Sequence, residues 1–264
     1  MLKGLFNYRL SVTQKICLAG LFIAIVTILQ KIFAINYIPI IPFLRISLGG
    51  PAIIIFSSIF LGPIYGMAIG AASDVLGYFL FDPKNMSFFP QITAIYALLG
   101  LVSYLIFWLF KNIKNVKLML IIEGVSFIAI LAGITIYLFL NTNLQLYGNS
   151  YTLELWQRIL IPSAMFVLLA GLFVTSILFE RRYKKDLLPM NPVAISFSCF
   201  VIEVLVMILF GTLMKGLAFG FKTYPMILIC QLVVMAVNIP LNTWLIILLL
   251  RVTNRYSNQE EHSI

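Results

Sequence analysis

The chain has 264 residues, of which 62% are hydrophobic and only 10% are charged, and this composition excludes an ordinary soluble domain. The net charge of +9 arises from eighteen basic and nine acidic residues. In so apolar a chain it indicates membrane orientation better than nucleic-acid binding.

Eight apolar runs predict an all-α integral membrane protein with about eight transmembrane helices. A span needs roughly 20 apolar residues to cross about 30 Å of hydrocarbon. The first run is too long for the apolar core of a signal peptide, and no A-x-A cleavage site follows it, so we expect it to be the first span. The predicted helices cover residues 13–35, 48–61, 63–81, 91–110, 118–139, 159–179, 192–214 and 226–250.

A glycine–proline pair divides residues 48–81, which form the most informative stretch of the chain. A single helix through it would be about 50 Å long at 1.5 Å per residue, which is too long for a bilayer without severe tilt. Pro63 lacks an N–H and suits the first turn of a new helix. We therefore predict a tight hairpin at Gly62-Pro63.

The second helix of this hairpin carries a row of glycines that ends in an acid. Gly62, Gly66, Gly70 and Asp74 follow one another at four-residue spacing. Such small-residue rows let a neighbouring helix approach to backbone contact in membranes, so we expect close packing on this face. An ionisable group inside a span is costly, and Asp74 is either a polar anchor near a substrate cavity or an interhelical hydrogen bond that fixes packing.

Three segments resemble the substrate-binding (S) component of energy-coupling factor (ECF) vitamin transporters, and the folate-type branch most of all. The first is R-I-S-x-G with a following proline, continued by L-G-P-x-x-G-x-x-x-G-x-x-x-D, over residues 45–74. The second, residues 88–93, is similar to the aromatic-Pro-Gly-x-Thr segment of that branch. The third, Gly20 to Ala24, is similar to the small-xxx-small motif by which S components dock on their coupling partner. Pro51 stands nearer to the Ser-x-Gly than the family pattern places it.

The resemblance implies capture of a vitamin, with folate as the first candidate, from outside the cell. Transport then needs a transmembrane coupling subunit and two ATPase subunits as partners, with Gly20 and Ala24 at the contact. We expect one membrane domain over residues 1–256, in which residues 13–111 and 192–251 form a six-helix core. Residues from about 112 to 190 are then an inserted helix pair, and residues 257–264 a polar cytoplasmic tail.

The basic residues predict how the chain is oriented in the cell membrane. With eight spans, twelve of the eighteen basic residues share the face that carries both termini. The positive-inside rule makes this richer face cytoplasmic. A seven-span alternative divides the basic residues eleven to seven, so span length rather than charge favours eight. Residues 140–157 then form the longest external loop, which is either a lid or a connector.

The predicted external face gathers rings and cations that suit an aromatic ligand with an acidic tail. Flat ligands stack on aromatic rings, and carboxylates bind Arg or Lys. The same residue types also form the aromatic belt and snorkelling cations of any membrane interface, and both interpretations stay open. The candidate substrate-binding residues are Phe43, Arg45, Ser47, Asp74, Tyr78, Phe89 and Gln91.

Two further acids lie within predicted spans. Glu123 is about two turns from Lys117 and is expected to pair with it or to snorkel. Glu203 has no obvious local cation, so it must face protein or water, and it is a candidate member of a proton path.

The expected function is therefore the substrate-binding subunit of an ECF-type transporter. A stand-alone proton-coupled secondary transporter is the alternative, favoured by Glu203 and the extra helix pair. An enzyme is disfavoured because no nucleophile–base set is visible, the single histidine is His262, and no Walker A motif occurs. We expect no metal and no cofactor, because the three cysteines (Cys17, Cys199 and Cys230) show no pairable spacing and no Cys/His cluster.

Overall fold

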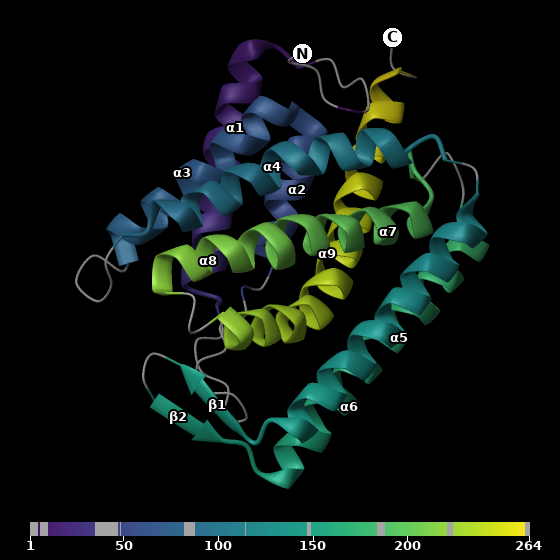
Figure 1. Ribbon diagram of the computed structural model, residues 1–264. Helices are drawn as coiled ribbons and strands as arrows, with labels where there is room; N and C mark the ends of the chain where they lie inside the picture. The colour runs from purple at the N-terminus through teal and green to yellow at the C-terminus, as the bar shows by residue number, and fades with distance from the viewer. Residues whose placement is uncertain are drawn as a thin grey trace.

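The computed structural model describes residues 5, 10–34, 47, 49–81, 88–113, 115–146, 149–183, 188–220 and 224–261, and helices make up most of it (Figure 1). In chain order the elements are α1 (Val12–Lys31), α2 (Gly50–Leu61), α3 (Pro63–Phe81), α4 (Pro90–Phe110), α5 (Val116–Leu140), β1 (Asn143–Leu146), β2 (Asn149–Thr152), α6 (Leu155–Arg181), α7 (Pro192–Ile202), the π-helix η1 (Glu203–Phe210), α8 (Gly211–Phe219) and α9 (Tyr224–Glu261).

The predicted all-α membrane fold is confirmed. Within the described residues, seven helices are long and apolar enough to cross a membrane, and α2 is a shorter apolar helix. One of the seven, Pro192–Phe219, consists of α7, η1 and α8 in succession. The sequence did not predict the antiparallel β1–β2 hairpin inside the loop of residues 140–157, nor the continuation of α9 to Glu261.

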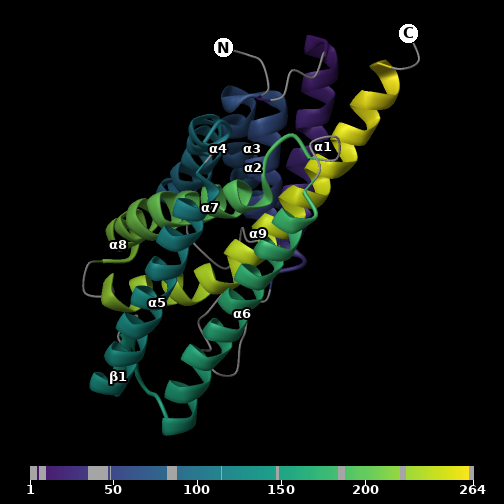
Figure 2. The same ribbon diagram turned by 90° about the vertical axis from the view of Figure 1, so that its right-hand side faces the viewer.

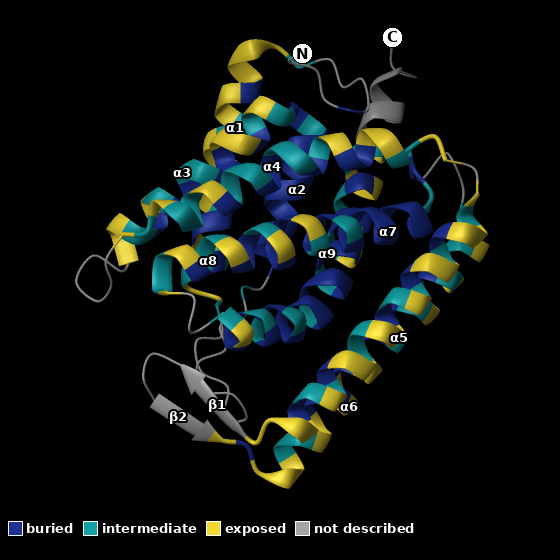
Figure 3. Cartoon of the chain, in the orientation of Figure 1, coloured by how far each residue is buried: buried dark blue, intermediate teal, exposed yellow. Residues whose placement is uncertain are grey.

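The hairpin predicted at Gly62-Pro63 is present between α2 and α3. Gly62 has a φ of 114°, which suits a residue without a β-carbon, and its N–H donates to the carbonyl oxygen of Ser58 at 3.0 Å. The 12 residues of α2 make a helix about 18 Å long at 1.5 Å per residue, shorter than the seven long apolar helices. Except for Phe60 they are buried (Figure 3), because α1, α3, α4 and α9 all pack against this helix.

The glycine row brings α3 and α4 into backbone contact, as predicted. A β-carbon at Gly70 would clash with the carbonyl oxygen of Tyr96, and one at Gly100 would clash with the carbonyl oxygen of Gly66. On the adjoining side of α3, a β-carbon at Gly66 would lie 2.5 Å from Cβ of Ser58 on α2. Helix crossings this close depend on glycine at the contact.

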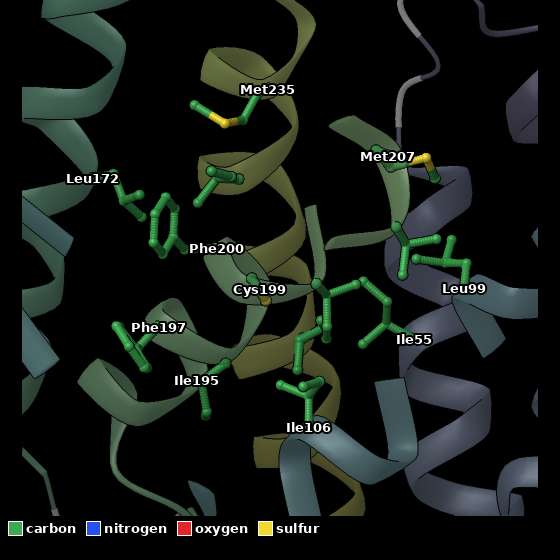
Figure 4. Close-up of a cluster of buried hydrophobic side chains, with 14 of the residues drawn as sticks. Ile55, Leu99, Ile106, Leu172, Ile195, Phe197, Cys199, Phe200, Met207 and Met235 are labelled. Carbon is green, nitrogen blue, oxygen red and sulfur yellow. The ribbon is translucent and has the colours of Figure 1, made fainter. Parts of the chain in front are cut away.

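Helix α7 runs through the middle of the bundle and carries much of the core. Every residue from Pro192 to Phe200 is buried (Figure 3). Figure 4 shows side chains of α2, α4, α6, η1 and α9 gathered around those of α7. The labelled members of this cluster are Ile55, Leu99, Ile106, Leu172, Ile195, Phe197, Cys199, Phe200, Met207 and Met235.

The two ends of the chain come to the same end of the bundle. The start of α1 and the last turns of α9 lie together there in both views (Figures 1 and 2). Helices α5 and α6 form a long pair along one flank, with the β1–β2 hairpin at its far end (Figure 1). This pair packs against α7 and α9, which in turn pack against α4 and α2, so α7 and α9 lie between the flank pair and α1–α4.

Replacing Gly70 with Ala should destabilise the protein, because the added β-carbon would meet the backbone of α4. Overpacking of this kind costs about 1–3 kcal/mol. Gly133→Ala on α5 is the matched control, since no described atom lies within 4 Å of its β-carbon position and Ala favours helix over Gly. Thermal unfolding in detergent should show a lower midpoint for Gly70→Ala alone, and equal midpoints would contradict the tight α3–α4 contact.

Candidate functional site

Two of the seven candidate substrate-binding residues, Phe43 and Arg45, lie outside the described residues. Ser47 precedes α2, and its Oγ is buried with no hydrogen-bond partner within the described part of the chain. A β-carbon at Gly50 would lie 3.0 Å from this oxygen and would clash with the side chain of Gln30. Ser47 therefore sits where the end of α1 meets the start of α2.

Asp74 makes a hydrogen bond between α3 and α4. Thr93 Oγ1 donates to Asp74 Oδ2 at 2.6 Å, and Asp74 is buried on the glycine-lined face of α3. This contact supports the packing interpretation of Asp74. It also fixes the start of α4, where Gln91 lies two residues before Thr93.

Aromatic rings connect the end of α3, the start of α4 and the end of α8. The ring centroids of Tyr78 and Phe88 are 5.2 Å apart, and those of Phe89 and Phe219 are 4.9 Å apart in an edge-to-face arrangement. Gln91 follows on α4, and its Oε1 is buried without a partner among the described residues. The fold thus brings four of the predicted residues, Asp74, Tyr78, Phe89 and Gln91, to one junction.

Two polar side chains that were not predicted lie towards the same junction. Thr212 on α8 is fully buried, and Gln231 on α9 is almost so. Neither Thr212 Oγ1 nor Gln231 Nε2 has a hydrogen-bond partner within the described ranges. A β-carbon at Gly211 would lie 3.6 Å from Gln231 Nε2 and 3.9 Å from Ile95 Cδ1, so this part of α8 faces both α9 and α4.

Thr212 and Gln231 are uncharged, so a search of the spans for charged groups does not find them. Gln231 interrupts an apolar run, and polar side chains in membrane interiors commonly have a structural or functional partner. Gln91 has an amide oxygen one turn before Ile95 on α4, and Thr212 and Gln231 have a hydroxyl and an amide nitrogen near the contact of α8 with α9. Such groups suit a ligand that carries both hydrogen-bond donors and acceptors.

Glu203 lies deeper in the bundle, at the first residue of η1. Only 1% of Glu203 is exposed, and Asn238 Nδ2 of α9 donates to its Oε1 at 2.9 Å. The expectation that Glu203 lacks a local cation was wrong, because Lys215 of α8 interacts with it electrostatically. Residues of π-helices frequently occur at functional sites.

Glu123 is paired inside the bundle and does not snorkel towards Lys117. It is 2% exposed, and Ser196 Oγ of α7 donates to its Oε1 at 2.7 Å. Helix α5 packs on α7 through this face, which turns Glu123 inward while Lys117 remains exposed. The hydrogen bond gives Glu123 a role in holding the flank pair on the core.

The predicted docking residues lie on an exposed face of α1. Gly20 and Ala24 are exposed, as are Cys17, Leu21 and Ile28 along the same helix. No described atom lies within 4 Å of a β-carbon built at Gly20. Gly20 therefore does not pack inside the core.

A model of one protein family, ECF transporter, substrate-specific component, matches residues 14–179, which is more than half of the chain. The chain belongs to this family. No curated protein and no solved structure matches it.

Family membership assigns a transport role to this membrane protein. As the substrate-specific component of an ECF transporter, it binds a small-molecule substrate and works in the membrane with an ECF module. The family is one of transporter components rather than enzymes. The match runs through α5 and most of α6, the helices that we predict to be an insertion.

Thr93→Val should lower the thermal stability of the S component, because it leaves a buried carboxylate oxygen of Asp74 without this donor. A hydrogen bond to a charged group contributes about 1.5–3 kcal/mol. The matched control is Thr135→Val on α5, which loses only a bond to Leu131 of its own helix. If both variants unfold at the same temperature, Asp74 does not stabilise the α3–α4 packing.

Proposed function

We propose that this S component captures a vitamin, with folate as the first candidate, from outside the cell for import. The observation that carries the proposal is the junction of α3, α4 and α8, where aromatic rings lie beside buried polar atoms that have no partner in the described part of the chain. Folate is preferred to other vitamins because residues 45–74 and 88–93 resemble the folate-type branch. Folate is a flat heterocycle joined to an acidic tail, which suits the rings and cations that the sequence predicts on the external face.

The proposed roles follow from the chemistry of each side chain. Arg45 and Ser47 hold the carboxylates of the tail near the outer mouth, and Phe43 shields them from water. Tyr78 or Phe89 stacks on the heterocycle, and Gln91 offers its buried amide oxygen to a ligand donor. Asp74 supports this site from behind through Thr93.

Arg45→Ala should weaken folate binding by at least about tenfold if Arg45 lines a dry pocket, since hydrogen bonds to charged groups there contribute about 1.5–3 kcal/mol. An exposed ion pair contributes only about 0–1 kcal/mol, so a snorkelling Arg45 would change the affinity little. Lys111→Ala, at the opposite end of α4 from Gln91, is the control for loss of one positive charge.

The measurement is a titration of folate, riboflavin and thiamine into the purified protein, followed by intrinsic fluorescence. Saturable folate binding that is weakened in Arg45→Ala and not in Lys111→Ala is the expected result. Saturable binding of riboflavin or thiamine without folate would discard folate as the substrate and keep the family role.

For the ECF module, we propose that a transmembrane coupling subunit docks on the exposed face of α1 around Gly20 and Ala24, and that two ATPase subunits complete the assembly. The open space around Gly20 supports this assignment, because small residues let a partner helix approach closely. The stand-alone proton-coupled transporter needs no such surface.

Gly20→Leu should reduce co-purification of the S component with the coupling subunit while leaving its thermal stability and vitamin binding unchanged. The new side chain would block a close helix contact without meeting a described atom of its own chain. Gly133→Leu, at an equally open position on α5, is the matched control and should co-purify normally. Equal recovery of both variants with the coupling subunit would exclude Gly20 from the interface.

For orientation, we propose that both termini are cytoplasmic and that residues 140–157 are external. The common end of α1 and α9 (Figures 1 and 2) and the twelve-to-six division of basic residues support this proposal. Cysteines placed singly at positions 145 and 260, after removal of the three native cysteines, should label from opposite sides of the membrane. Labelling of both from the same side would contradict it.

A further inference from the structure

A group of buried polar side chains between the α7–η1 segment and α9 is only partly hydrogen-bonded. Glu203 and Asn242 are each 1% exposed. Glu203 Oε2 and both amide atoms of Asn242 have no hydrogen-bond partner in the described ranges. Burying polar atoms without hydrogen-bond partners costs free energy. We therefore expect a bound molecule to supply the missing hydrogen bonds.

Two contacts define how the helices lie around this group. Asn238 Nδ2 donates to Glu203 Oε1 at 2.9 Å, and one turn earlier on α7 the Cys199 thiol lies against Thr243. The segments therefore run antiparallel here. Asn242 is one turn beyond Asn238 on α9, on the same face, and this places it opposite the Cys199–Glu203 turn.

The unpartnered atoms specify the hydrogen bonds that a ligand must supply. Lys215 of α8 interacts electrostatically with Glu203 but makes no hydrogen bond to Oε2. An ionised Oε2 accepts, so it still needs a hydrogen-bond donor. The amide of Asn242 needs one acceptor for Nδ2 and one donor for Oδ1. Adjacent ring N–H, amino and carbonyl groups of a nitrogen heterocycle offer this combination on one edge, whereas an aliphatic or purely acidic ligand does not.

We propose that Glu203, Asn238 and Asn242 form a second subsite, deeper in the bundle than Tyr78 and Phe89, which binds the hydrogen-bonding edge of a nitrogen heterocycle once the transported molecule has moved inward from the junction of α3, α4 and α8. This inference rests on the proposed function as a substrate-binding subunit, but it does not require the substrate to be folate. Asn238 is a positioning residue, since its bond to Oε1 holds the carboxyl group and leaves Oε2 to accept from the ligand.

Glu203→Gln is the primary test, with Glu123→Gln as the matched control. Both substitutions remove the charge of a buried carboxyl group. Glu203 lies in the same membrane span as α7, whereas Glu123 on α5 is hydrogen-bonded to Ser196 of α7 and lies outside the subsite. The probes are folate, the isolated 2-amino-4-oxopteridine, and p-aminobenzoylglutamate, which lacks the heterocycle. Glu203→Gln should weaken binding of the first two by at least about tenfold, because a charge-assisted hydrogen bond is lost, and should not change binding of the third.

Asn242→Leu separates recognition from folding. It should abolish binding of the pteridine while keeping or raising the unfolding temperature of the ligand-free protein, since it removes two buried polar atoms that have no partner among the described residues. A lowered unfolding temperature together with unchanged binding would show that Asn242 is structural and would overturn the proposal.

The remaining outcomes distinguish this subsite from the choice of vitamin. If the wild type binds folate and the Glu203 and Glu123 variants bind it equally, the subsite is wrong and folate stands. If the wild type binds only thiamine or riboflavin, loss of that binding in Glu203→Gln supports the subsite and discards folate, whereas unchanged binding overturns the subsite. Absence of binding to every probe overturns both.

Discussion

Hydrocarbon cannot hydrogen-bond, so each polar atom inside a membrane-spanning bundle needs a partner from the protein or from a molecule that the protein binds. Many buried hydroxyls here meet this requirement locally: those of Ser57, Ser103 and Ser198 donate to carbonyl oxygens of their own helices. The atoms that do not meet it within the described residues therefore carry information. Most of them lie on α8, η1 and α9 or at the start of α4, rather than on the flank pair.

The close contact of α3 with α4 determines where one side of the candidate site lies. Glycine at residues 66, 70 and 100 lets the two backbones touch, and Thr93 then reaches Asp74. That bond fixes the first turn of α4, so Phe89 and Gln91 face the bundle where α8 ends. The close packing of α3 on α4 thus also sets the positions of Phe89 and Gln91, which we propose to bind substrate.

Span length and turn chemistry were readable from the sequence because they depend on local properties. Apolar run lengths predicted the long helices, and Gly62-Pro63 predicted the hairpin between α2 and α3. Four candidate residues, Asp74, Tyr78, Phe89 and Gln91, lie around the junction of α3 and α4, and their role in substrate binding remains a prediction. The position of Arg45 remains a prediction, because that residue lies outside the described part of the chain.

The hydrogen-bond partners of buried polar side chains could not be predicted from the sequence, because they depend on which helices pack together. The sequence suggested Lys117 for Glu123, but α7 covers that face of α5 and supplies Ser196 instead. Equally, nothing in the local pattern around Thr212, Gln231 or Asn242 shows that all three point into one bundle interior, because the crossing of α8 and α9 is a tertiary property. The π-helix at Glu203 is likewise an outcome of packing that periodicity does not predict.

Glu123 and Glu203, the two glutamates near α7, differ in how completely the protein hydrogen-bonds their carboxyl groups, and this difference distinguishes a structural role from a functional one. Ser196 and Cys199 on α7 and Glu203 at the start of η1 follow one another at spacings of three and four residues, so they share one helix face. At one end of this face, Glu123 receives a serine hydroxyl and links the flank pair to the core. At the other end, Glu203 receives one amide donor and keeps a second buried oxygen without a described partner. Packing alone explains the first carboxyl. For the second we infer a ligand that donates to it, because selection for stability alone favours an apolar side chain at a buried position of that kind.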